Sequence, residues 1–123
     1  MKKTWEKLQR LAIEEIETLF EELPKPVRER ASALPLIFER APSAELQANG
    51  IEADTLGLFA GAEMADQSIE VMPPQIILFL ENLWILADGD EKTFCDEVRT
   101  TFLHELGHFF GLGEDELFER GLE

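Results

Sequence analysis

The chain has 123 residues, of which 45% are hydrophobic, so it fits a single domain over residues 1–123 with a core of its own. Nine phenylalanines and two tryptophans supply the large apolar area that disordered chains lack. The formal net charge of −15 would repel a phosphate backbone, so this composition argues against nucleic acid as a partner.

The first twenty residues predict an amphipathic helix. Thr4 can cap a helix that starts at Trp5. Acidic residues cover one face, and apolar residues recur at helical spacing on the other, with Phe20 beside them: Trp5, Leu8, Ala12, Ile16, Leu19 and Leu23. Pro24 and Pro26 end this helix, and Pro26 can open a short second one.

The same region bears on cellular location. Acidic residues interrupt it, so it offers neither the apolar stretch of a signal peptide nor the roughly 20 apolar residues of a membrane span. We therefore expect a cytoplasmic protein that does not bind membranes. We also expect a monomer or a weak dimer.

Two strands are predicted before residue 64. Residues 34–40 (LPLIFER) form an apolar run between prolines, which favours a strand. Residues 43–54 are polar and contain an Asn-Gly pair, which predicts a loop. Residues 56–63 (LGLFAGAE) alternate weakly and predict a second strand, with a turn after Gly61.

The next segments predict a further strand and two helices. Residues 64–74 indicate a hairpin return or a loop. Residues 75–80 (QIILFL) are the clearest strand, because β-branched and aromatic residues follow two prolines. Residues 81–87 predict a short helix, and Asp90 can cap a long helix from residue 91 to about residue 110.

The end of the chain completes the fold prediction. Gly111 and Gly113 end the long helix, and residues 114–122 predict a final short helix. Because the helices flank the strands instead of alternating with them, the fold class is α+β with a small sheet. Cys95 is the only cysteine, so no intramolecular disulfide can form, and its place in the helical pattern predicts a small core residue.

The long helix carries the only two histidines of the chain. His104 and His108 are one turn apart, so both imidazoles can bind one metal ion at about 2.0–2.1 Å. Glu105 lies about 100° around the helix from His104 and about 60° from His108, where a general base for a metal-activated water belongs. This is the HExxH arrangement of zinc metallopeptidases. Manganese, cobalt or nickel would suit similar ligands.

A catalytic zinc site needs a third protein ligand. No third histidine exists in the chain, which leaves a carboxylate or Cys95. Cys95 lies more than two turns back along the same helix, on the side that the pattern assigns to the core. A carboxylate is therefore the expected third ligand.

Residues 104–114 (HELGHFFGLGE) resemble the HExxHxxGxxD motif of the aspzincins and of the bacterial mini-zincins, a small zincin-like metallopeptidase family. The resemblance covers most of the chain, and this last block is its specific part. It implies a minimal zincin-like fold, in which a small sheet packs against the long HExxH helix, with an N-terminal helix and an edge strand near the metal.

The resemblance also implies roles for particular residues. It makes His104 and His108 ligands of one zinc ion and Glu105 the catalytic base. The aspartate of the motif falls on Glu114, and zinc accepts either carboxylate. Asp115 could ligate instead if the turn were shifted by one residue, so both alternatives stay open, with Glu114 favoured.

Together these features predict a zinc-dependent metallopeptidase in which Glu105 is the general base toward a metal-activated water and the substrate is a peptide or protein. The substrate would lie extended along a sheet edge that residues 57–61 or 75–80 supply. Because the chain has no tyrosine and no spare histidine, Arg40, Arg99 or a backbone N–H would have to stabilise the oxyanion.

Two other classes of function fit the same residues. One is a catalytically inactive, metal-binding protein that uses a zincin-like fold for binding or regulation. The other is a metal-free acidic interaction domain.

Overall fold

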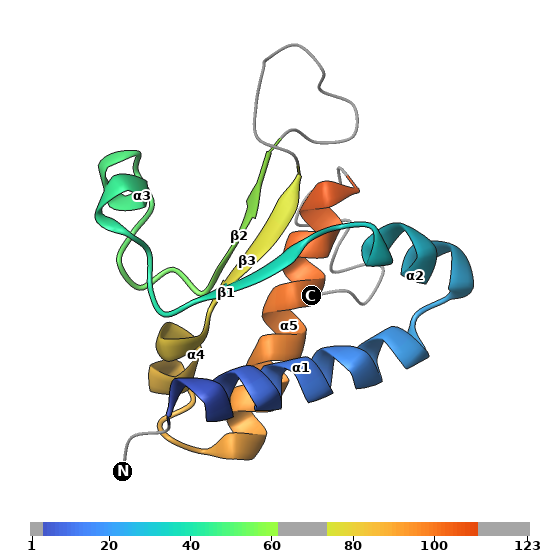
Figure 1. The fold of residues 1–123 in the computed structure, drawn as a ribbon, viewed down its shortest axis with the longest axis horizontal. Helices are drawn as coiled ribbons and strands as arrows, with labels where there is room; N and C mark the ends of the chain where they lie inside the picture. Colours follow the sequence, from blue (N-terminus) through green and yellow to red (C-terminus); the bar gives the residue numbers. More distant parts are fainter. Residues whose placement is uncertain (1–3, 62–73, 111–123) are drawn as a thin grey trace.

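The structure, a computed structural model, describes residues 4–61 and 74–110. These residues form five helices and a three-stranded sheet, which confirms the α+β class (Figure 1). The helices are α1 (Trp5–Glu22), α2 (Lys25–Ser32), α3 (Ala44–Ala48), α4 (Leu80–Leu86) and α5 (Glu91–Phe109). The strands are β1 (Leu36–Glu39), β2 (Gly57–Ala60) and β3 (Gln75–Phe79).

The N-terminal helix begins where the sequence predicts. The Thr4 hydroxyl accepts a hydrogen bond of 3.2 Å from the Lys7 backbone N–H, which caps α1. The predicted apolar stripe is buried in the core, through Leu8, Ala12, Ile16, Leu19 and Leu23. The helix ends before Pro24, and α2 opens one residue before Pro26, as expected.

The segment predicted as a loop over residues 43–54 contains a helix. The Ser43 hydroxyl accepts a hydrogen bond of 3.1 Å from the Leu46 backbone N–H, and this cap starts α3. The helix ends at Ala48 with Asn49 as its C-cap, and Gly50 follows with a φ of 99°. The prediction of a loop is therefore wrong for residues 44–48, because the serine cap supports one short helix without any buried residue.

β3 is the centre of the sheet, whose strand order is β1-β3-β2. β1 runs parallel to β3, and β2 runs antiparallel to it, with Phe59 opposite Ile76. Every residue of β3 is buried, including the polar Gln75, and the apolar run over residues 76–79 is typical of such a strand. The strand ends one residue before its predicted limit, because Leu80 already belongs to α4.

This strand order decides which strand could receive an added chain. β3 has a partner on both sides and offers no free edge, so the expectation that residues 75–80 supply the substrate-binding edge is wrong. Among residues 4–61 and 74–110, β2 is an edge strand, so the other alternative, residues 57–61, stays a prediction.

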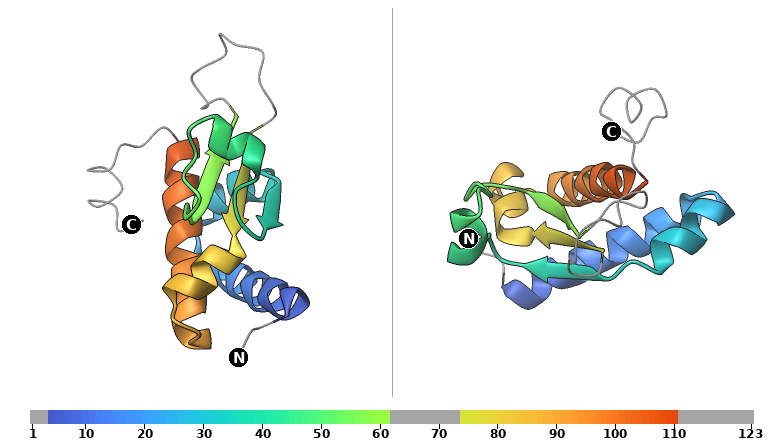
Figure 2. Two further views of the ribbon diagram at one scale, coloured as in Figure 1. Left: turned by 90° about the vertical axis from the view of Figure 1, so that its left-hand side faces the viewer. Right: turned by 90° about the horizontal axis from the view of Figure 1, so that it is seen from above.

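The long helix α5 packs against β2 and β3, and α1 crosses it at a steep angle (Figure 1). Figure 2 shows the C-terminal half of α5 beside β2. The buried face of α5 joins α1 and the sheet in one core through Phe94, Val98, Phe102 and Leu106. Arg99 adds ion pairs from α5 to Glu15 and Glu22 of α1, each with an N···O distance of 2.7 Å.

Several predicted features lie outside the described residues. They are the turn after Gly61, the connection over residues 64–73, the end of the long helix at Gly111 and Gly113, and the final helix over residues 114–122. Within the ranges 4–61 and 74–110, no helix is long and apolar enough to cross a membrane.

Candidate metal centre

The helix that carries the histidines is fixed at its start and along one face. The Asp90 carboxylate accepts a hydrogen bond of 2.8 Å from the Thr93 backbone N–H and caps α5. The buried face then holds the helix against the core, while His104, Glu105 and His108 lie half-buried at its border.

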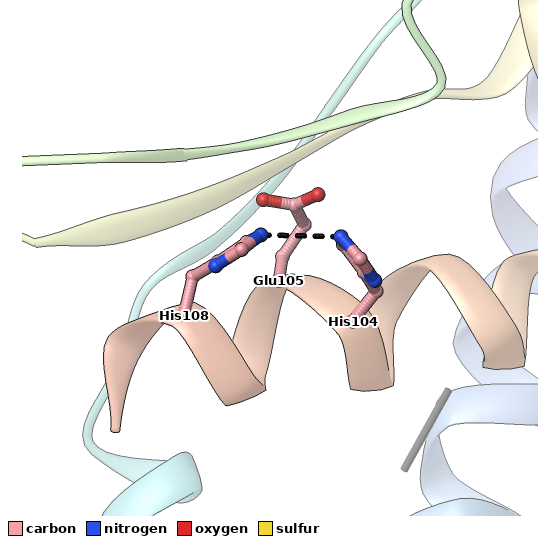
Figure 3. A group of neighbouring side chains, drawn as sticks. All are labelled: His104, Glu105 and His108. Carbon is pink, nitrogen blue, oxygen red and sulfur yellow. Dashed lines mark hydrogen bonds between the residues drawn. The ribbon is translucent and has the colours of Figure 1, made fainter. Parts of the chain in front are cut away.

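The two imidazoles face one another. Their Nε2 atoms are 3.1 Å apart, and the ring centroids are 4.7 Å apart in an edge-to-face arrangement (Figure 3). Two nitrogens that bind one tetrahedral ion at about 2.0–2.1 Å would be separated by about 3.3 Å. The spacing of the Nε2 atoms therefore already fits two ligands of the same zinc ion.

A carboxylate completes this group. The candidate ligand atoms of His104, Glu105 and His108 all lie within 4.8 Å of one another. Figure 3 shows all three side chains projecting from the same side of α5, toward the strands of the sheet. Glu105 Oε1 accepts a hydrogen bond of 2.9 Å from the backbone N–H of Phe59 in β2. Edge strand, carboxylate and imidazoles therefore meet at one place.

β2 approaches α5 closely beside this group. A Cβ atom added to Gly57 would lie 2.6 Å from Cγ2 of Thr101, so only glycine allows the observed distance between strand and helix. A pocket of about 380 Å³ opens there, lined by Leu56, Gly57, Thr100, Thr101, His104 and Glu105. Apart from the histidine and the glutamate, this lining is uncharged. His104 and Glu105 thus lie in the wall of a pocket whose other lining residues are uncharged.

Both arginines named as possible oxyanion partners are engaged elsewhere. Arg40 Nη1 contacts Glu81 at 2.6 Å, and its guanidinium stacks on the Trp5 ring at 4.8 Å. Arg99 binds two glutamates of α1, whose hydrogen bonds raise the pKa of its guanidinium further above its usual value. Neither arginine lines the pocket beside the histidines. Of the three predicted sources, a backbone N–H is the one that these contacts leave open.

Cys95 lies apart from the candidate centre. It is half-buried and packs against the core instead of lying within it as predicted, and the group of close ligand atoms in the described ranges does not include it. Burial, together with nearby acidic side chains such as Glu15, raises the pKa of its thiol. The predicted third ligands, Glu114 and Asp115, lie outside the described residues, so they stay predictions.

The structure adds three residues that the sequence did not single out. Phe59 contributes only its backbone N–H, which has no sequence signature. Thr101 stands one turn before the first histidine, on the side of the helix that faces β2. Gly57 did carry a signal, because a glycine inside a strand often marks a close backbone approach.

Comparison with known protein families identifies the family of the chain. The sequence model of a family described as zincin-like metallopeptidase matches residues 31–122, which include β1, β2, β3 and the whole of α5. Comparison with curated proteins gave no match. The family match covers the histidine motif and the strands that surround it.

Proposed function

Because the chain belongs to the zincin-like metallopeptidase family, we propose that it is a zinc-dependent peptidase centred on His104, Glu105 and His108. The observation that carries this proposal is the pair of Nε2 atoms 3.1 Å apart with a carboxylate beside them. The 3.1 Å contact is also a hydrogen bond between the two rings, which a metal-free pair of histidines can form. The carboxylate within 4.8 Å of both rings, together with the family match, is what favours a metal site.

The ligands would be His104, His108 and one carboxylate beyond α5. Glu114 is the favoured carboxylate, and Asp115 is the alternative. When bound, zinc would activate a water molecule and polarise the carbonyl of the peptide. The half-buried position of the imidazoles suits this task, because part of each ring stays exposed and a pocket opens beside His104.

Glu105 would move the proton. Its carboxylate would take a proton from the attacking water and then deliver that proton to the amine that leaves. The carboxylate lies beside both imidazoles, and its Oε1 atom is bonded to Phe59. This placement supports the role of a base next to the ligands in preference to that of a third ligand.

The edge of β2 would align the substrate through the main-chain groups that Glu105 does not occupy. An extended peptide can add to an edge strand through main-chain hydrogen bonds and place alternate side chains on one face. The pocket between β2 and α5 would then receive one of those side chains. Its uncharged lining of Leu56, Gly57, Thr100 and Thr101 favours an uncharged side chain.

Cleavage of a peptide library by zinc-loaded protein tests this proposal, with Glu105→Gln as the inactive variant. Glu97→Gln is the matched control, because it makes the same change about two turns earlier on α5. We expect cleavage by wild type and Glu97→Gln, and a loss of at least 100-fold in Glu105→Gln with zinc retained. If zinc-loaded wild type cleaves nothing, the protein is the inactive metal-binding alternative.

A further inference from the structure

A hydrogen bond between Phe59 and Glu105 links the edge strand to the candidate base. It joins β2 to α5 across 46 positions of sequence, with an N···O distance of 2.9 Å. The donor is a backbone N–H within a paired strand, so it cannot rotate away as a side-chain donor can. A bond from such a donor to an ionised carboxylate is also stronger than one between neutral groups.

The direction of this N–H follows from the pairing of the strand. The Leu56 carbonyl accepts a hydrogen bond of 2.9 Å from the Phe79 backbone N–H, so it faces β3. Residues along an antiparallel strand alternate between facing the partner strand and facing away from it. The N–H of Phe59, three residues on, therefore points to the outer edge of β2, where Glu105 meets it.

Two further contacts hold the donor in place. The Phe59 ring packs edge-to-face on Phe109, near the end of α5, with ring centroids 5.8 Å apart. Gly57 lets the strand come close to Thr101 of the same helix. β2 is thus attached to α5 on both sides of Glu105, and the position of the Phe59 N–H is set by the core.

From these contacts we propose that the backbone N–H of Phe59 is the positioning group for Glu105. The N–H would hold Oε1 so that the carboxylate stays beside the metal ligands as a base, a role that rests on the proposed function. Without this bond, Glu105 is near enough to His104 and His108 to be drawn onto a cation as a ligand. A displacement of about 1 Å at a catalytic group can cost about 100-fold in rate.

The first test is amide hydrogen exchange in metal-free protein, which needs no activity. An N–H on the outer edge of a strand exchanges quickly unless it has a partner. We expect slow exchange at Phe59 in wild type, and exchange at least tenfold faster in Glu105→Ala. Exchange at Phe59 that is equally fast in both proteins would overturn the proposal.

The second test removes the donor. Phe59→Pro lacks the N–H, and proline is tolerated where a strand N–H faces outward. Phe59→Ala is the matched control, because it loses the ring and keeps the N–H. We expect kcat of Phe59→Pro to fall at least tenfold below that of Phe59→Ala, with KM within about twofold and zinc content unchanged. Equal kcat values in the two variants would overturn the proposal.

An ester in place of the amide at Phe59 covers the case in which Phe59→Pro fails to fold. The ester replaces the N–H by oxygen and keeps the aromatic side chain. We expect its kcat to fall at least tenfold below that of wild type, and a kcat equal to that of wild type would refute the positioning role. Failure of the proposed function has a different signature. In that case zinc-loaded wild type cleaves no peptide, while amide exchange at Phe59 is still slow in wild type and faster in Glu105→Ala.

Discussion

The close approach of Gly57 in β2 to Thr101 in α5 predicts how Gly57→Ala would affect the protein. The added Cβ would lie 2.6 Å from Thr101 Cγ2 and 3.2 Å from Leu78 Cδ2. Carbon atoms in favourable contact are about 3.5–4.0 Å apart, so strand and helix would have to separate by about 1 Å. The leucine methyl can rotate, whereas Thr101 is β-branched and 9% exposed, so it has little freedom to move away.

The size of the effect follows from two opposing terms. Overpacking of this kind costs about 1–3 kcal/mol. Replacing glycine by alanine also restricts the unfolded chain, which stabilises the folded protein by about 0.4–1 kcal/mol. We therefore expect Gly57→Ala to lower the free energy of unfolding by about 1–2 kcal/mol, which urea denaturation of metal-free protein would measure.

Thr101→Ser supplies the control, because it removes the Cγ2 methyl that the new Cβ would meet. In the Thr101→Ser background, Gly57→Ala should cost less than about 0.5 kcal/mol, so the two changes should be coupled by at least about 0.5 kcal/mol. Gly57→Ala with wild-type stability, or with the same cost in both backgrounds, would refute the steric explanation.

Three further predictions concern the core and the charged groups. Phe94 is fully buried, so Phe94→Ala should lower the free energy of unfolding, measured in urea, by about 3–5 kcal/mol. Ile85 is 73% exposed, so the control Ile85→Ala should change it by less than about 0.5 kcal/mol. Because the thiol pKa of Cys95 is raised, a thiol reagent at pH 8 should modify it more slowly in folded protein than in urea, and equal rates would contradict its burial. The hydrogen bond from Arg99 lowers the pKa of Glu22. Wild type should therefore have a higher free energy of unfolding than Glu22→Gln above pH about 4.3, and this difference should disappear as the pH falls further. A difference that does not change with pH would contradict this.

The sequence predicts the elements whose formation is decided locally. α1 and α5 begin at the capping residues Thr4 and Asp90, and their apolar stripes are the faces that become buried. β3 could be predicted because an apolar β-branched run between prolines and a helix has few alternatives. α3 was missed because it buries no residue, so hydrophobic periodicity does not mark it, and only the Ser43 cap does.

The arrangement of the site depends on contacts that no local pattern encodes. The spacing of His104 and His108 predicts that they face one another, because it follows from one helical turn. The strand that meets them is decided by the order β1-β3-β2, which the sequence left open between residues 57–61 and 75–80. The bond from Phe59 to Glu105 depends on this tertiary order and on a backbone atom that every residue except proline has.

Zinc content per chain tests the central claim most directly. Elemental analysis of tag-free, zinc-loaded protein would compare wild type with His108→Ala, Glu114→Ala and Asp115→Ala. We predict about one zinc ion per wild-type chain, lost in His108→Ala and in one of the two acidic variants, with Glu114→Ala expected. A wild-type chain that retains no zinc, or a His108→Ala variant that retains as much as wild type, would contradict a zinc site at the two histidines.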